Sequence, residues 1–194
     1  MIYLKRFFMP KYALFHSCFL LLLSLLLVTP ATADYLEVEW IELIPEHDLE
    51  ALMNPPEWLD EMEDESMEGQ ISMQMSAVLE QAHDSRYHEA LVSTKTREEF
   101  NLRKIKIPGF IVPLEHNAKQ EVTRFFLVPY FGACIHVPPP PPNQIIYGRH
   151  DAGIRQDNLY DPFWLEGTLE TSLVENDMAT SAYSMTVDRA YAYE

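Results

Sequence analysis

The pattern of apolar and polar positions along the chain changes near Arg97. From there to the C-terminus, short apolar or alternating runs are separated by proline, glycine and asparagine, which is typical of β-strands joined by turns. In the last run Tyr183, Met185 and Val187 alternate with polar residues, so their side chains share one face. The predicted strands lie in the runs Lys104–Ile107, Arg124–Val128, Gln144–Tyr147, Phe163–Leu169 and Ala182–Val187. Residues 97–194 are therefore predicted to form a mainly β domain.

The number and length of these runs limit the choice among β architectures. Five short strands suit a small closed barrel, and a barrel like the five-stranded oligonucleotide/oligosaccharide-binding (OB) fold is the first choice. A β-sandwich or a mixed α+β sheet is the alternative. Gly167 lies inside a predicted strand, where a glycine marks a kink or a β-bulge.

Residues 34–96 show a different pattern. Apolar residues recur at helical spacing from Ile71 to Ala82, which predicts an amphipathic helix over residues 70–92. Seven of the twelve residues in Glu57–Glu68 are acidic, which predicts a solvated linker or an exposed helix face. Acids interrupt the apolar residues of Tyr35–Ile44, and either a short strand or an interfacial arm fits that pattern. We therefore expect an arm, an acidic linker and a helix ahead of the barrel.

Residues 1–33 have the features of a cleaved secretory signal peptide. Residues 1–12 carry three basic side chains and no acid, and the later triplet Ala31-Thr32-Ala33 resembles an A-x-A cleavage site. The apolar run between them, Phe19–Val28, is about ten residues long, whereas a membrane-spanning helix needs about 20. We therefore predict export to the periplasm, with Asp34 as the mature N-terminus and at most a peripheral association with the membrane.

Net charge restricts the class of partner. Without residues 1–33 the chain keeps 11 basic and 30 acidic residues, a formal net charge of −19. Such a chain repels nucleic acid and anionic lipid and attracts cations or a basic protein. Nucleic acid is therefore excluded as a ligand. Removal of Cys18 with the signal peptide leaves Cys134 as the single cysteine, so an intramolecular disulfide is excluded as well.

The most unusual stretch of the sequence is Phe126–Asn143, in which Gly-Ala-Cys-Ile-His-Val precedes five prolines. Together with Ile107–Glu115, Trp164–Leu169 and Ala182–Met185, this stretch resembles the bacterial family called domain of unknown function 3299. The resemblance covers residues 104–190. It implies an exported bacterial protein encoded near ABC-type transporters that act on lipoproteins or in export, sometimes in a setting linked to zinc supply. It implies no established activity.

Cys134 and His136 in this stretch are candidate metal ligands. They are two residues apart, so in an extended segment both side chains lie on one face and can reach one ion. A thiolate and an imidazole suit zinc or copper. Glu115, His116 and His150 are the candidates for the third and fourth ligands, because loops of a barrel can bring these positions together. Alternatively, Cys134 is a small buried apolar residue and His136 bonds to loop backbone.

These observations favour a non-enzymatic periplasmic accessory protein of a transport system. In this hypothesis the loop containing Cys134, His136 and the prolines binds a transporter or another envelope protein, a soft metal ion such as zinc, or both. The tract Pro138–Pro142 is expected to form a polyproline II rod, which acts as an internal spacer or docks in an aromatic groove of the partner. The rival hypothesis is an enzyme that uses Cys134 as a nucleophile and His136 as its base.

Overall fold

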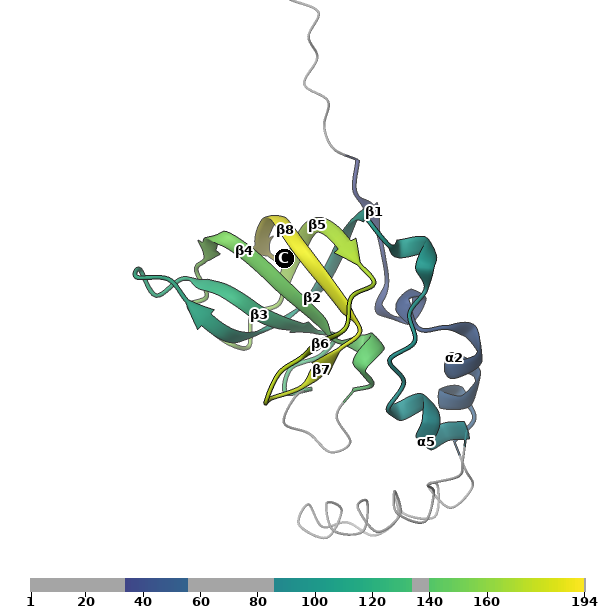
Figure 1. Ribbon diagram of the computed structural model, residues 1–194. Helices are drawn as coiled ribbons and strands as arrows, with labels where there is room; N and C mark the ends of the chain where they lie inside the picture. Colours follow the sequence, from purple (N-terminus) through teal and green to yellow (C-terminus); the bar gives the residue numbers. More distant parts are fainter. Residues whose placement is uncertain (1–33, 56–85, 134–139, 194) are drawn as a thin grey trace, which may run out of the picture. The chain divides into compact units, whose positions relative to one another are not determined.

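The computed structural model describes residues 34–55, 86–133 and 140–193 of the chain (Figure 1). The described residues all belong to one compact unit, which begins at Asp34. The predicted signal peptide, the acidic run at residues 57–68 and the residues Cys134 and His136 lie outside the described residues.

Five strands close into a barrel (Figure 1). Around the barrel β2, β3, β4, β8 and β5 each pair with the next, and β5 pairs back with β2. The β4–β8 pairing is parallel and the others are antiparallel. The strands are β2 (Arg103–His116), β3 (Val122–Val128), β4 (Ile146–Ile154), β5 (Phe163–Glu170) and β8 (Tyr183–Ala192). A closed five-stranded barrel whose third and fifth strands run parallel has the arrangement of an OB-type barrel, so the mainly β, OB-like prediction is confirmed.

Alternate residues of the strands fill the barrel. In β2, for example, Ile105, Ile107 and Ile111 are buried and belong to the main core cluster. The predicted apolar face of the last strand is confirmed, because Tyr183, Met185 and Val187 all lie in the same cluster. The period-two pattern of the sequence therefore identified the inward face of the strands correctly.

Strand β2 is longer than predicted because it pairs with two strands in succession along its length. Up to Gly109 it pairs with β5, and from Phe110 onward it pairs with β3. A Cβ atom on Gly109 would lie 2.8 Å from the carbonyl oxygen of Val128, so the close approach at this change of partner requires glycine. The prediction Lys104–Ile107 covered only the first part of β2. Pro108 and Pro113 concealed the remainder, because a proline within a run argues against a paired strand.

The predicted strand Gln144–Tyr147 begins two residues too early. Residues Pro142–Gln144 form a 3₁₀ turn, η3, and β4 begins at Ile146. The side chain of Gln144 is buried in this turn, where its Nε2 donates to the carbonyl oxygen of Trp40 at 2.7 Å. This long-range hydrogen bond ties the start of β4 to the N-terminal segment, and the local sequence could not reveal it.

The β-bulge predicted at Gly167 is confirmed. The register between β5 and β8 shifts between Glu166 and Gly167. A Cβ atom on Gly167 would lie 2.2 Å from the carbonyl oxygen of Thr186, which is backbone of the neighbouring strand. Glycine is therefore required here because any side chain would clash with the neighbouring strand, and not because the backbone adopts a turn.

The N-terminal segment consists of short elements. These are β1 (Leu36–Glu37), η1 (Trp40–Leu43), α2 (Glu46–Met53), α5 (Arg86–Leu91) and η2 (Glu98–Phe100). Of these, β1 contacts β2 and α2 packs against α5. β1 pairs in parallel with β2, so of the two alternatives for Tyr35–Ile44 the short strand is correct for its first residues. The predicted helix over residues 70–92 is helical at Arg86–Leu91, and its remainder falls mostly outside the described residues. None of the helices in the described part of the chain has the length and apolar character needed to span a membrane.

Two buried polar contacts fasten this segment. The hydroxyl of Tyr183 in β8 accepts from the backbone N–H of Arg97 at 2.7 Å and donates to the carbonyl oxygen of Leu43 at 2.9 Å. The carboxylate of Asp48 in α2 is almost fully buried and accepts from Ser93 Oγ at 2.5 Å. Because buried polar groups need such partners, the Tyr183 contacts tie the segment to β8, and the Asp48 contact joins α2 to the residues after α5.

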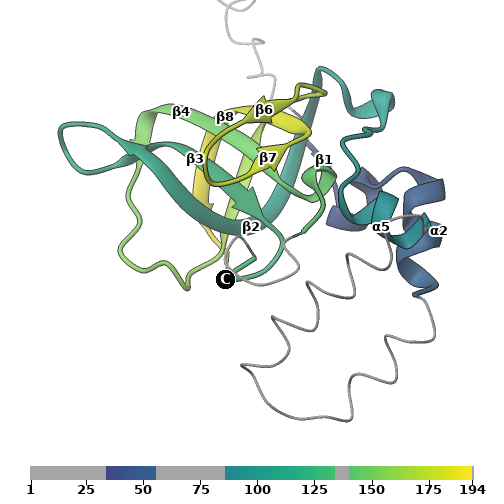
Figure 2. The ribbon, with the colours of Figure 1, turned by 60° about the horizontal axis from the view of Figure 1, so that its bottom comes forward.

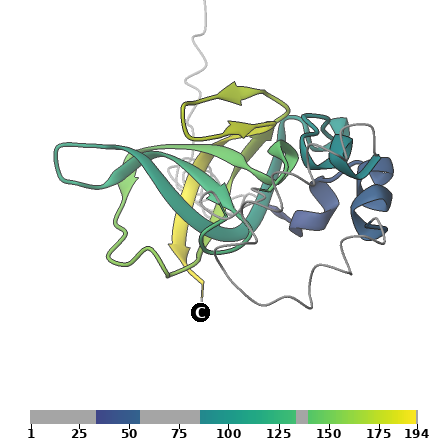
Figure 3. The same cartoon turned by 90° about the horizontal axis from the view of Figure 1, so that it is seen from below.

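A small hairpin lies outside the barrel. Strands β6 (Val174–Glu175) and β7 (Thr180–Ser181) pair with each other in the connection between β5 and β8 (Figures 2 and 3). The hairpin lies against η3, and the backbone N–H of Ala182 after it donates to the carbonyl oxygen of Pro142 at 2.8 Å. The connection thus approaches the outer face of β3 and β4.

Candidate functional site

The outer face of β2, β3 and β4 carries a second apolar cluster. Phe126, Val128, Ala133 and Ile145 are buried in it. Partly buried apolar residues pack against these four: Phe110, Val112, Leu114, Tyr147 and Ala179. The outward positions of a barrel strand normally face water and are polar, so an apolar outer face indicates that something packs on it.

An apolar groove of about 210 Å³ borders this cluster. We call it the β2 groove. Its lining is formed by Phe110, Ile111, Val112, Pro113, Phe131, Gly132, Leu159 and Met178. Phe131, Leu159 and Met178 are 40%, 53% and 52% exposed, so three large apolar side chains at this groove face solvent. Exposed apolar side chains gathered at one groove make it a candidate binding site.

A second apolar hollow, of about 300 Å³, adjoins the groove. The two share Phe110. The other lining residues of the second hollow are Trp40, Pro108, Gly109, Pro129, Pro162 and Tyr193. Prolines and aromatic rings make up most of this second lining, and such surfaces suit extended apolar segments.

Aromatic packing shapes the wall of the groove. The ring of Phe131 lies 6.2 Å from the ring of Phe110 in an edge-on arrangement and 4.3 Å from the ring of Tyr160. Strand β2 and two connections that are distant in sequence therefore meet at Phe131. Since aromatic pairs of this geometry stabilise one another, the wall is preformed.

The described candidates for metal ligands lie elsewhere on the barrel. Glu115 and His116 are exposed at the end of β2 and pair with Arg124 and Val122, at the start of β3. His150 lies in β4, and its Nδ1 is 2.9 Å from the carbonyl oxygen of Val187. Within residues 34–55, 86–133 and 140–193, no three His, Cys, Asp or Glu side chains gather as a metal site.

The segment that contains Cys134 and His136 begins near the end of β3, far from Glu115 and His116, which pair with the start of β3. Ala133, the last described residue before it, packs with Phe126 and Val128. Because Cys134 and His136 fall outside the described residues, their roles as metal ligands or as a nucleophile and its base stay predictions.

Part of the proline tract is described. Pro140 and Pro141 are buried, and the carbonyl oxygen of Pro141 accepts from the backbone N–H of Gln144 at 2.7 Å. Of the two alternatives for the tract, the internal spacer agrees with this burial, because buried prolines are not available to a partner.

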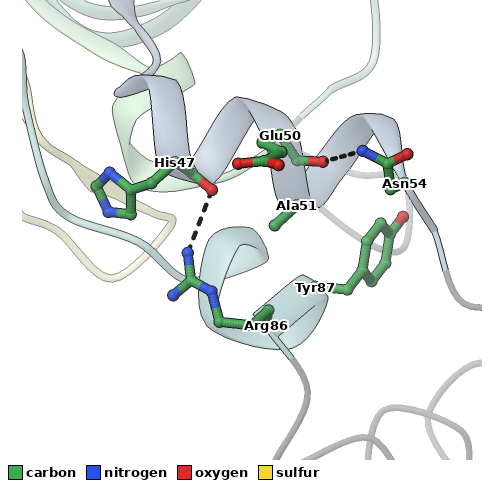
Figure 4. Close-up of a pocket in the computed structure, with 6 residues that line it drawn as sticks. All are labelled: His47, Glu50, Ala51, Asn54, Arg86 and Tyr87. Atoms are coloured by element: carbon green, nitrogen blue, oxygen red, sulfur yellow. Dashed lines mark hydrogen bonds between the residues drawn. The ribbon is translucent and has the colours of Figure 1, made fainter.

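A third hollow, of about 510 Å³, lies between α2 and α5 (Figure 4). Arg86 donates to the carbonyl oxygen of His47 at 3.2 Å, and the Asn54 side chain donates to the carbonyl oxygen of Glu50 at 2.7 Å. The Arg86 hydrogen bond joins α5 to α2, and the Asn54 hydrogen bond closes the C-terminal end of α2. The β2 groove, with its exposed apolar lining, is therefore the stronger candidate for a binding site.

Sequence reasoning did not identify the β2 groove, although part of its signal was present. Two of the motifs that carried the family resemblance supply Phe110–Pro113 and Phe131–Gly132 to the lining. Leu159 and Met178 come from connections that carried no recognisable pattern. Only folding brings these four pieces of chain together.

Comparison with known proteins agrees with this fold. A family profile described as "Protein of unknown function (DUF3299)" matches residues 40–192. Among solved structures, the crystal structure of a DUF3299 family protein from Pseudomonas aeruginosa PAO1 is similar, with a TM-score of 0.59 and 33% sequence identity. The match covers 84% of this chain and 98% of that chain. No curated protein matches the chain.

Proposed function

The chain belongs to the DUF3299 family, and from this premise we propose that it is a non-enzymatic periplasmic accessory protein that binds an apolar segment of an envelope protein in the β2 groove. The observation that carries this proposal is the exposed apolar lining of the groove on the outer face of the barrel. The secretory pattern of residues 1–33 supports the periplasmic location. The transport setting rests on what the family resemblance implies.

Site-specific cross-linking tests the partner. We expect a photoreactive residue at Leu159 to give one discrete adduct in the bacterial envelope, because Leu159 lines the groove and is 53% exposed. Leu173 is the matched control, because this leucine is 54% exposed but does not line the groove. Adducts would be analysed by mass spectrometry. Equal adduct patterns from the two positions, or no adduct from Leu159, would contradict the proposal.

Zinc binding through Cys134 and His136 is the second part of the proposal. The support is the spacing of a thiol and an imidazole two residues apart in a segment that begins beside the groove, after Ala133. Zinc held there would fix the segment next to the bound partner and would supply no reaction of its own.

Elemental analysis of untagged protein from the periplasm tests this part. We expect about one zinc per chain, lost in Cys134→Ser and in His136→Ala, because a site that loses a ligand loses most of its affinity. The variants His116→Ala and His150→Ala determine whether these residues complete the site. Retention of zinc by both the Cys134→Ser and the His136→Ala variants would refute a site in this segment.

A further inference from the structure

The β2 groove contains a strand edge as well as apolar side chains. β2 pairs with β5 only as far as Gly109, whereas its pairing with β3 continues to His116. In the described part of the chain, no strand pairs with the other edge of β2 beyond Gly109. Four consecutive residues of this stretch, Phe110–Pro113, line the groove. An occupant of the groove therefore meets backbone groups of β2.

A side chain covers this edge at one position. The carbonyl oxygen of Ile111 accepts a hydrogen bond from Nε2 of Gln156 at 3.1 Å. Backbone groups in an antiparallel strand point to alternate sides, so the backbone groups of Ile111 and Pro113 both point to the unpaired edge of β2. Pro113 has no N–H, so it offers only its carbonyl oxygen at this edge.

The amide of Gln156 resembles a peptide group of a missing strand. It supplies the donor that the Ile111 carbonyl requires, as the backbone N–H of a neighbouring strand would. Its Oε1 atom is buried and has no hydrogen-bond partner among the described residues. A buried acceptor without a partner is costly, so a strand that replaced this amide at the Ile111 carbonyl would remove that cost.

The residues next to the groove lining in sequence are acidic. Three exposed aspartates lie within two residues of Leu159 or Met178, and we call them the rim: Asp157, Asp161 and Asp177. Arg155 is a nearby base, but its Nε is 2.9 Å from Asp157 Oδ1. The rim thus keeps a net negative charge, in agreement with the excess of acids in the whole chain. Charge complementarity favours an occupant with basic residues on either side of its apolar part.

We propose that the β2 groove binds an extended peptide segment by strand addition to Phe110–Pro113. Apolar side chains of the segment occupy the groove, and its flanking lysine or arginine residues lie at the aspartates of the rim. This inference rests on the proposed function and specifies the kind of segment and how it is held. An acyl chain would also suit apolar walls, but it makes no use of the strand edge, and anionic lipid is repelled by the rim.

Synthetic peptides test this inference by fluorescence anisotropy with protein purified from the periplasm. The probe has alternating valine and threonine flanked by two lysines at each end. One derivative carries N-methyl groups on the valines, a second carries them on the threonines, and a third has glutamate in place of lysine. The protein variants are Leu159→Asp in the groove and the matched control Leu173→Asp outside it.

We expect the lysine-flanked probe to bind, and one of the two methylated derivatives to bind at least about tenfold more weakly while the other is nearly unaffected. This alternation is specific to strand pairing, because only every second N–H of an added strand faces its neighbour. The glutamate-flanked peptide and the Leu159→Asp protein should each lose at least about tenfold in affinity, whereas Leu173→Asp should not.

The outcomes separate this inference from the proposed function. Equal tolerance of both methylated derivatives would overturn strand addition, and equal binding of the glutamate-flanked peptide would overturn the charge preference. Failure of every peptide, or preferential binding to phosphatidylglycerol vesicles, would overturn the inference as a whole. The cross-linking experiment at Leu159 tests the proposed function independently of these results.

Discussion

The Gly167→Ala variant is expected to lose about 2–4 kcal/mol of unfolding free energy, although it adds only one methyl group. In an ordinary strand position, alanine is more stabilising than glycine by about 0.5–1 kcal/mol, so the destabilisation expected here is opposite in sign to the usual effect of this substitution. The reason is a steric clash. The new Cβ atom would lie 2.2 Å from the Thr186 carbonyl oxygen and 2.9 Å from the Val187 Cα, and both are backbone atoms of β8.

Because backbone cannot move aside as a flexible side chain can, β8 must shift away from β5 at the bulge. Urea denaturation followed by circular dichroism measures the loss. Thr168→Ala is the matched control: it changes a half-buried residue next to Gly167 and should cost less than about 1 kcal/mol. A Gly167→Ala protein as stable as the wild type would show that β5 and β8 leave room for a methyl group at the bulge.

The second large effect is expected at Tyr183, whose side chain is fully buried in the barrel core. We expect Tyr183→Ala to lose about 4 kcal/mol of unfolding free energy, as other large-to-small aromatic truncations do. Tyr183→Phe should lose about 1–3 kcal/mol, because it keeps the ring but leaves the Arg97 N–H and the Leu43 carbonyl without their partner. Thermal and urea unfolding of the two variants separates packing from hydrogen bonding.

The hydroxyl of Tyr183 also predicts how stability depends on pH, and Tyr183→Phe, which lacks this hydroxyl, is the control variant. Burial raises the pKa of Tyr183 above its ordinary value of about 10, because the phenolate is poorly solvated there. A group whose pKa is raised by folding contributes stability below its unfolded pKa, and that contribution is lost as the pH rises through the folded pKa. Wild-type protein should therefore lose more stability above about pH 10 than Tyr183→Phe does. Identical alkaline losses would contradict a buried, hydrogen-bonded phenol.

Several features of the fold could be predicted because their causes are local. The alternation at Tyr183, Met185 and Val187 reflects burial of one strand face, and it held in the structure. Gly167 was recognisable as a bulge because a glycine inside a strand adds no side chain to the core and commonly marks a close approach of backbone. The same local logic misjudged β2, in which prolines 108 and 113 are tolerated by its change of neighbour at Gly109.

The candidate site could be predicted only in part. The sequence directed attention to the stretch around Cys134, and Ala133 and Phe131 from that stretch do lie at an apolar face. The prediction that loops would bring Glu115, His116 and His150 to Cys134 and His136 stays untested, since the last two lie outside the described residues. Nothing in the local pattern of Leu159 or Met178 marked them as groove residues, because neither belongs to an apolar run of helical or strand period.

The sequence by itself determined the barrel class, the inward faces of the strands and the resemblance to the DUF3299 family, because periodicity and motif residues are properties of the chain. Only the tertiary structure decided which strands pair, where β2 leaves β5, and which connections meet at Phe131. These features depend on contacts between residues that are far apart in the chain. Their free energy comes from packing and from hydrogen bonds that form only once the barrel has closed.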